Sequence, residues 1–205
     1  MGRNSSKEKA KQREHACKVL DLLVGEYTTE YRCYLNHENA WQLLFATILS
    51  AQCTDARVNI VTADLFRKYP SVEAFAGADL KELEQEIHST GFYHNKAKNI
   101  IACARRVLTE FGGEVPSSLE DLTSLAGVGR KTANVIASVI YDKPVIAVDT
   151  HVFRVSNRLG IANGDTPEKV EEQLMAGFDE EVWSKLHHYL IFHGRYVCKA
   201  QKPNC

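Results

Sequence analysis

Apolar residues recur at helical spacing through most of this 205-residue chain, and that pattern limits the fold more than any other feature. The stripes cover residues 16–23, 41–48, 97–111, 133–140 and 183–191. Pro and Gly separate them, at Pro70, Gly91, Gly112, Gly113, Pro116, Pro144, Gly160, Gly164 and Pro167. Each stripe needs a partner helix to cover it. Only residues 143–148 have strand-like character, too short a run to found a sheet. The sequence therefore predicts an all-α fold of roughly ten short helices.

The termini of the predicted helices and of the chain carry further signals. Ser117 or Ser118, and Thr166 before Pro167, are typical helix starts. Residues 1–13 are polar and charged, with no apolar stretch behind them, so we expect a frayed tail rather than a secretory signal. No apolar run approaches the ~18 residues of a transmembrane helix. We therefore expect no membrane contact and a cytoplasmic location.

Charge is segregated although the net charge is only −1. Basic residues gather in three groups, namely Arg130, Lys131 and Lys143; Lys96, Lys98, Arg105 and Arg106; and Arg195, Lys199 and Lys202. Acidic residues gather between 168 and 181. Any one charged run is most simply a solvated face. The segregation as a whole favours a basic cleft for a nucleic acid.

The segment 125–133, Leu-Ala-Gly-Val-Gly-Arg-Lys-Thr-Ala, predicts a tight turn between two helices. Gly127 and Gly129 lack a Cβ, so the backbone can adopt positive φ and approach a ligand closely. The first N–H groups of the next helix have no partner within it and lie at the positive end of its dipole. A phosphate fits such a site.

Two side chains near this turn are candidates for chemistry. Lys131 lies roughly opposite the apolar stripe of the second helix, at about 100° per residue, so its amine faces a cleft or solvent. A solvated surface lysine is the simpler alternative. Asp149, in Val148-Asp149-Thr150-His151, either caps the helix that follows or serves as a catalytic carboxylate. Both roles are compatible, because one oxygen can cap while the other faces a cleft. We assign no role to His151.

Several motifs in the same order resemble those of the helix-hairpin-helix DNA glycosylases, and most of all the endonuclease III family. The hairpin is Leu122-x-x-Leu125-x-Gly127-Val128-Gly129-x-Lys131, followed by Val148-Asp149-Thr150-His151. Residues 49–55, 91–97 and 193–198 resemble further family segments. Ala126 stands where the family usually has proline, so the turn should be slightly less rigid with no donor lost.

The resemblance implies two lobes with an active-site cleft between them. A six-helix barrel containing the hairpin would span residues 33–143. The second helical lobe would join residues 1–32 to 144–205. The implied activity is base-excision repair of damaged double-stranded DNA by a monomer that removes oxidised pyrimidines and then cleaves the abasic strand.

The resemblance also implies roles for single residues. Lys131 would attack C1′ of the damaged nucleotide and form a Schiff base, which acidifies the C2′ proton and permits β-elimination. Asp149 would stabilise positive charge on the sugar and help move protons. Gly127, Val128, Gly129 and Arg130 would hold phosphates. Because the target base must leave the stack, Gln52 would fill the gap. An exposed loop glutamine is its simpler reading, and Asp55 is a candidate cap for the next helix.

The six cysteines fall into two groups. Cys17, Cys33, Cys53 and Cys103 lie in apolar surroundings and are expected in the core. Cys198 and Cys205 have the spacing of the first two ligands of the family's four-cysteine loop for a [4Fe-4S] cluster. Four thiolates normally hold such a cluster. With an incomplete ligand set, the cluster is doubtful and the loop around Lys199 and Lys202 is expected to be loosely held.

Two alternatives to this activity remain. A related glycosylase that excises adenine is disfavoured by Lys131, which relatives without lyase activity usually lack. A non-catalytic or inactive DNA-binding fragment of the same family would keep the hairpin. The joint presence of Lys131 and Asp149 argues against that fragment, and the missing cysteines argue faintly for it.

Overall fold

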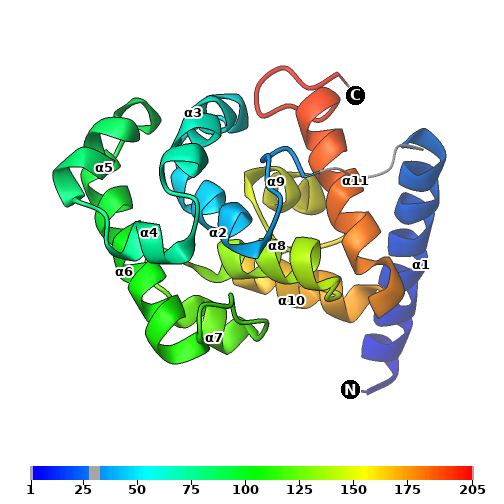
Figure 1. Ribbon diagram of the computed structural model, residues 1–205. Helices are drawn as coiled ribbons and strands as arrows, with labels where there is room; N and C mark the ends of the chain where they lie inside the picture. The colour runs from blue at the N-terminus through cyan, green and yellow to red at the C-terminus, as the bar shows by residue number, and fades with distance from the viewer. Residues whose placement is uncertain (1, 28–32, 205) are drawn as a thin grey trace. The chain divides into compact units, whose positions relative to one another are not determined.

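The computed structural model describes residues 2–27 and 33–204, with side chains from residue 11 onward. Contacts divide the chain into two compact units. We call Arg32–Lys143 the central unit, and Met1–Tyr31 together with Pro144–Cys205 the discontinuous unit. The described residues contain eleven α-helices, two short 3₁₀ helices and no strand, which confirms the all-α prediction (Figure 1).

The central unit contains seven α-helices and one 3₁₀ helix. They are α2 (Ala40–Leu49), α3 (Asp55–Lys68), α4 (Val72–Ala76), α5 (Leu80–Glu86), η1 (His88–Thr90), α6 (Tyr93–Phe111), α7 (Leu119–Ser124) and α8 (Arg130–Tyr141). The α6 helix packs against α2, α4 and α5, and α2 also packs against α8. Through α2, the hairpin helix α8 is tied to the rest of this unit.

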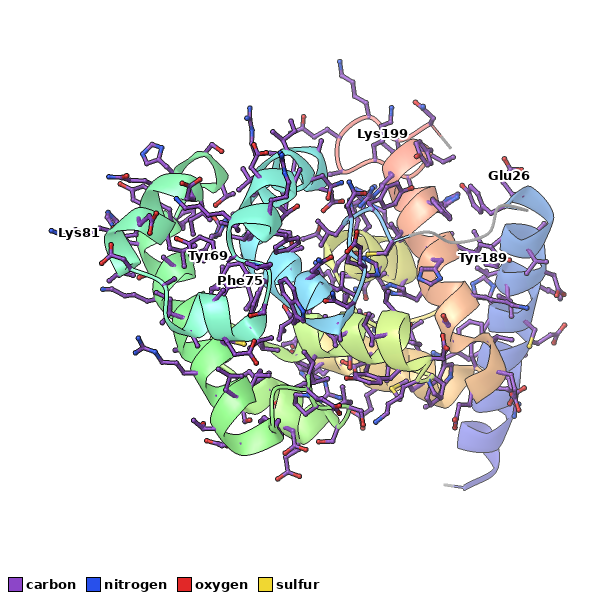
Figure 2. All side chains as sticks on the ribbon, in the orientation of Figure 1. Glu26, Tyr69, Phe75, Lys81, Tyr189 and Lys199 are labelled. Atoms are coloured by element: carbon purple, nitrogen blue, oxygen red, sulfur yellow. The ribbon has the colours of Figure 1, made fainter. Side chains whose placement is uncertain are left out.

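Local sequence accounts for most helix starts in the central unit. Asn39, Thr54, Ser71, Asp79 and Ser118 each accept a hydrogen bond from a backbone N–H in the first turn of the following helix. The core beneath α2 and α4 is aromatic. Tyr69 and Phe75 lie close together there, with ring centroids 5.1 Å apart (Figure 2), and the Phe45 ring is 4.8 Å from Phe75. Edge and tilted contacts of this kind add to the stability that burial supplies.

The discontinuous unit consists of α1 (Gly2–Glu26), α9 (Thr150–Arg158), α10 (Pro167–Gly177), η2 (Glu180–Val182) and α11 (Trp183–Tyr196). The α9 helix packs against α10 and α11, and α1 packs against α10 and α11. Its buried core joins Val19 and Leu23 of α1 to Val152, Leu174 and Leu190. Thr166 caps α10 with Pro167 in the first turn, as predicted.

Three local expectations need comment. Residues 1–13 were expected to be a frayed tail, but the backbone is helical from Gly2 onward. The abundance of Lys, Glu, Arg and Gln, all good helix formers, explains the difference. Residues 143–148 form a connection without regular secondary structure, in which residues 145–148 are buried. In the described part of the chain, no helix has the length and apolar character needed to cross a membrane.

Candidate active site

The predicted hairpin is present, with α7 and α8 joined by residues 125–129. Leu125 and Val128 are buried and anchor the turn to the core, while Gly127 and Gly129 are exposed. The backbone N–H of Val128 donates to the Leu125 carbonyl at 3.2 Å. Alternation of buried apolar residues with exposed glycines thus leaves bare backbone at the tip of the turn.

The two glycines of the turn differ in whether the backbone and its surroundings require glycine. Gly127 has φ +77°, and a Cβ there would lie 2.9 Å from the Asn99 Cβ on α6. Gly129 has φ −88°, and no atom lies within 4 Å of a Cβ placed on it. Only Gly127 is required by backbone conformation and packing. Asn99, which the sequence did not single out, fixes how closely α6 approaches the turn.

Of the three amide donors predicted in the turn, one is used within the turn itself. The Val128 N–H is already used inside the turn. The N–H groups of Gly127 and Gly129 have no hydrogen-bond partner among the residues that the structure describes. Arg130 opens α8 and is exposed. Two amides therefore lie where an anion could reach them, next in sequence to the positive charge of Arg130.

Lys131 is the second residue of α8 and is exposed, whereas Ala133, Ile136 and Ala137 on the same helix are buried. Its Nζ makes no ion pair or hydrogen bond with any residue in the described part of the chain. The helical angle thus predicted the exposure of this amine correctly. An amine without a partner is chemically available to a ligand.

Asp149 caps α9 through one of its two carboxylate oxygens. Its Oδ1 accepts hydrogen bonds from the backbone N–H groups of His151 and Val152, both at 2.8 Å. Its Oδ2 has no hydrogen-bond partner within residues 11–27 and 33–204. The two N–H donors fix the carboxylate plane at the start of α9. Both alternatives for Asp149 are therefore compatible with the geometry.

Gln52 lies on the connection between α2 and α3 and is exposed. Its φ of 53° places it in the left-handed region, which costs a non-glycine residue about 1–2 kcal/mol. The N–H of the next residue, Cys53, donates to the Ser50 carbonyl at 3.0 Å and closes the turn. Asp55 was considered as the cap of α3, but Thr54 is the cap, and its Oγ1 accepts from the Arg57 N–H.

The segment after α11 is firmly held, contrary to the expectation of a loose loop. The Arg154 guanidinium donates to the carbonyls of Gly194 and Cys198 at 2.9–3.1 Å. Arg158 donates to the Lys199 carbonyl at 2.8 Å and contacts the Cys198 Sγ at 3.5 Å. Two arginines of α9 therefore organise this segment, on which Figure 2 labels Lys199. Neither was singled out from the sequence, although the Arg-x-x-x-Arg spacing places both on one helix face.

The cysteines support only part of the cluster interpretation. Cys198 is buried, and Cys205 lies outside the described residues. Of the four cysteines expected in the core, only Cys103 is buried; Cys17 is exposed, and Cys33 and Cys53 are half-buried. Cys17 falls on the solvent side of α1, between the buried positions 16 and 19. No group of three candidate metal ligands is found within the described ranges. Of the five described cysteines, only Cys198 lies at the predicted cluster loop, where a [4Fe-4S] cluster needs four ligands.

The basic group on α6 is not uniform. Lys98 and Arg105 are exposed, but Lys96 is buried at 4% exposure. Its Nζ donates to the carbonyls of Leu49 and Thr90 at 2.8 and 2.9 Å. The prediction that Lys96 belongs to a basic surface was therefore wrong. Lys96 lies four residues before the buried Ile100, so the helical pattern did place it on the core face.

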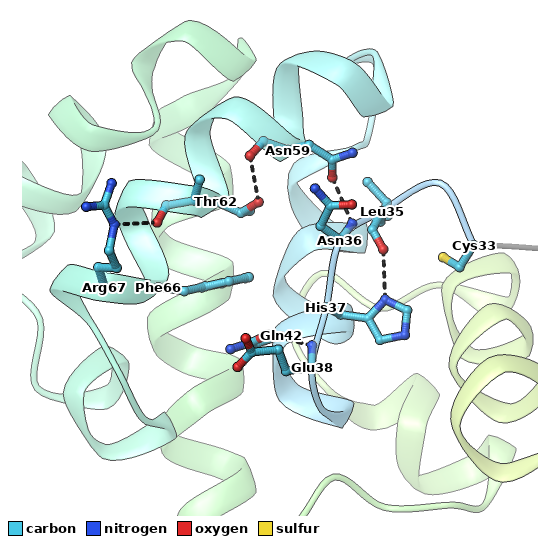
Figure 3. A pocket seen from close by; sticks show the side chains of 11 residues that line it. Cys33, Leu35, Asn36, His37, Glu38, Gln42, Asn59, Thr62, Phe66 and Arg67 are labelled. Atoms are coloured by element: carbon cyan, nitrogen blue, oxygen red, sulfur yellow. Dashed lines mark hydrogen bonds between the residues drawn. The ribbon is translucent and has the colours of Figure 1, made fainter.

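A cavity of about 480 Å³ opens in the central unit between residues 33–38 and helices α2 and α3 (Figure 3). The Asn59 Oδ1 accepts from the Asn36 N–H at 2.9 Å, and the His37 Nδ1 donates to the Leu35 carbonyl at 2.8 Å. None of the predicted site residues lines it. The cavity is therefore separate from the site that the sequence predicts.

Comparisons with known proteins identify the family of this chain. Residues 45–180 match the family described as HhH-GPD superfamily base excision DNA repair protein. The chain is 51% identical to the endonuclease III of Bacillus subtilis (strain 168) over 183 residues, covering 89% of this chain and 84% of that protein. It is 45% identical to the endonuclease III of Synechocystis over 197 residues, 96% of this chain and 90% of that protein.

A solved structure is similar throughout. The structure of a trapped endonuclease III–DNA covalent intermediate matches with a TM-score of 0.90 and 47% identity, covering 94% of this chain and 91% of that one. The expected helix-hairpin-helix glycosylase fold is thereby confirmed. The chain belongs to the endonuclease III family of HhH-GPD base excision DNA repair proteins, and its activity is that of a DNA glycosylase with abasic-site lyase activity.

Proposed function

We propose that this chain removes oxidised pyrimidines from damaged double-stranded DNA and then cleaves the abasic strand through a Schiff base on Lys131. The observation that carries the proposal is the exposed amine of Lys131, which has no partner among the described residues and lies in the first turn of α8, directly after the glycine turn. A similar protein, endonuclease III, has been trapped as a covalent intermediate with DNA, which supports a nucleophile of this kind.

The proposed reaction begins with the neutral amine of Lys131. The amine attacks C1′ of the damaged nucleotide, and the base leaves with its bonding electron pair and takes up a proton. The attached nitrogen then passes a proton to O4′ as the C1′–O4′ bond breaks, which opens the sugar ring and gives the Schiff base to Lys131. The positive imine acidifies the C2′ proton. Loss of that proton drives β-elimination of the 3′ phosphate, and the strand is cleaved. A water nucleophile would stop after base removal, so the lyase step requires this amine.

Asp149 is proposed as the second catalytic residue. Two backbone N–H groups hold its Oδ1, so the carboxylate orientation is fixed before substrate arrives. Its Oδ2 would stabilise the positive charge that develops on the sugar and assist proton movement at Lys131. Removing the charge while keeping the cap, as in Asp149→Asn, separates the two roles.

DNA binding is proposed to use the bare backbone of the hairpin turn. The N–H groups of Gly127 and Gly129, with the charge of Arg130, would hold phosphates and position the duplex without reading its sequence. Val128 would anchor the turn through its buried side chain. Gln52, presented on its exposed turn, would fill the space left by the flipped nucleotide.

Other proposals concern organisation and partners. Residues 33–143 would form the barrel lobe, and residues 1–32 with 144–205 the second lobe. The protein would act as a monomer on genomic DNA in the cytoplasm, without a membrane. Cys198 and Cys205 are the candidate cluster ligands, and members of this family generally bind a [4Fe-4S] cluster. Because the described cysteines do not complete a ligand set, no step of the proposed chemistry passes through a cluster.

Borohydride trapping tests the proposal. The chain is incubated with duplex DNA carrying one abasic site, beside Lys131→Ala and a matched control, Lys81→Ala. Lys81 is likewise exposed and is the second residue of α5, where Figure 2 labels it. We expect a reduced covalent adduct for the unaltered chain and for Lys81→Ala, and none for Lys131→Ala.

Two results would contradict the proposal. An adduct that persists in Lys131→Ala would assign the Schiff base to another amine. Failure of the unaltered chain to form an adduct while it still binds the duplex would favour the non-catalytic alternative.

A further inference from the structure

The buried Lys96 links two turns of the central unit through the ends of two short elements. Leu49 is the last residue of α2, and Thr90 is the last residue of η1. Carbonyls at a helix end have no partner within the helix and lie at the negative end of its dipole. The Lys96 ammonium, which donates to both, satisfies one such carbonyl in each element with a charge-assisted hydrogen bond.

Burying this amine costs free energy. Lys96 is 4% exposed, and burial lowers its pKa. It also lies in the first turn of α6, where the helix dipole disfavours a cation. The two helix-end carbonyls offset both effects. An apolar side chain would fill the same space without these costs, but it would leave the two carbonyls without this donor.

The two turns that Lys96 joins have an unusual backbone. Gln52 follows Leu49 by three residues with φ 53°, and Phe92 follows Thr90 by two residues with φ 49°. They are two of the four non-glycine residues with positive φ in the described chain. Both side chains are exposed, so their own packing does not hold these conformations. Strained conformations persist only where the surroundings over-determine them.

We propose that Lys96 is a positioning residue that fixes the Gln52 turn by tying the end of α2 to the 88–92 turn. Gln52 is then already in place when DNA arrives, and binding does not have to order the turn. Lys96 acts through Gln52 and does not itself meet the DNA. This inference rests on the DNA role of Gln52 given under the proposed function.

A double-mutant cycle separates positioning from general stabilisation. Lys96→Met removes the donor with little change in volume, and Gln52→Ala removes the side chain that it is proposed to position. Affinity is measured, below the unfolding temperature of every variant, for a duplex with a tetrahydrofuran abasic analogue. Lys81→Met is the matched control, because it removes an exposed charge from α5 of the same unit, outside the three basic groups.

We expect Lys96→Met and Gln52→Ala each to weaken DNA affinity about 10-fold. The double variant should weaken it by no more than about 20-fold relative to the unaltered chain. Lys81→Met should change affinity less than 3-fold. A fluorescent 2-aminopurine opposite the analogue should report the same loss of base contact in Lys96→Met as in Gln52→Ala. If Lys96→Met does not fold, Lys96→Gln takes its place in the cycle.

The contradicting outcomes differ. Multiplicative effects, near 100-fold in the double variant, would make Lys96 a stabilising residue unrelated to Gln52 and overturn the inference alone. An unchanged affinity in Gln52→Ala would overturn the proposed DNA role of Gln52, and the inference would fall with it. Trapping through Lys131 would be unaffected by either result.

Discussion

Two lysines in the central unit occupy similar places and have opposite surroundings. Both lie in the first turn of a helix that follows a turn with a left-handed residue, Gly127 before α8 and Phe92 before α6. Lys131 is exposed and unpartnered within the described residues, whereas Lys96 is buried against two carbonyls. The positive end of a helix therefore presents an amine to solvent in one case and to the carbonyl ends of other helices in the other.

The contrast shows which feature assigns a lysine to chemistry or to structure. Residue type and helix position are shared, so neither decides. The neighbours decide: a turn with exposed glycines precedes Lys131, and two carbonyl oxygens accept from Lys96. Substitution of Lys131 should then lower catalysis and spare stability, whereas substitution of Lys96 should lower stability.

The largest expected effect is on activity at Lys131. Lys131→Met should lower abasic-site cleavage by on the order of 10³-fold or more, because it removes the proposed nucleophile. Its unfolding free energy should change by less than about 0.5 kcal/mol, since the side chain is exposed. Single-turnover cleavage and urea unfolding measure the two quantities. A comparable loss of stability would erase the contrast with Lys96.

Stability is the property expected to respond at Lys96. Lys96→Met should lower the unfolding free energy by about 2–3 kcal/mol, because two buried carbonyls lose a charged donor. The same urea titration, with Lys98→Met beside it, gives the value. A neutral or stabilising result would show that an apolar side chain suits this site as well as the ammonium.

The two lysines also differ in how well the sequence predicted their surroundings. Helical stripes, caps and the exposed Lys131 were predictable because they depend on neighbours within about four residues in the chain. The contacts of Lys96 were not, because its acceptor at Leu49 is 47 positions away and belongs to another helix. The clamp of Arg154 on Cys198 spans 44 positions and was missed for the same reason. The burial of Lys96 was nevertheless readable from its spacing to Ile100.

The discontinuous unit extends the comparison to a buried histidine. Burial, with a smaller contribution from the neighbouring His187, lowers the pKa of His188 from 6.5 to about 3. Between these two pH values the unfolded chain binds a proton that the folded chain does not. The free energy of unfolding is therefore unaffected by protonation of this histidine above about pH 6.5, and it decreases as the pH falls toward 3.

At pH 5 the expected loss from His188 is about 2 kcal/mol relative to pH 7.5. Urea unfolding at both pH values measures it. His188→Gln should unfold with a smaller difference between the two pH values, because the group that binds the proton is gone. An unchanged difference would assign the acid sensitivity to other groups. The effect of burial on a titratable side chain would then apply to Lys96 and not to His188.

The smallest effect is expected in the turn that makes Lys131 available. Gly127→Ala should cost about 1–2 kcal/mol, because its φ of +77° disfavours a Cβ and Asn99 would have to move. Gly129→Ala should cost less than about 0.5 kcal/mol, since its φ of −88° suits alanine and no atom lies nearby. If the proposed phosphate contact is correct, Gly129→Ala should still weaken DNA binding, because a methyl group would cover part of the bare backbone. Equal stability with weaker binding would tie Gly129 to the ligand and Gly127 to the fold, and equal losses of stability at both positions would show that the whole turn serves the fold.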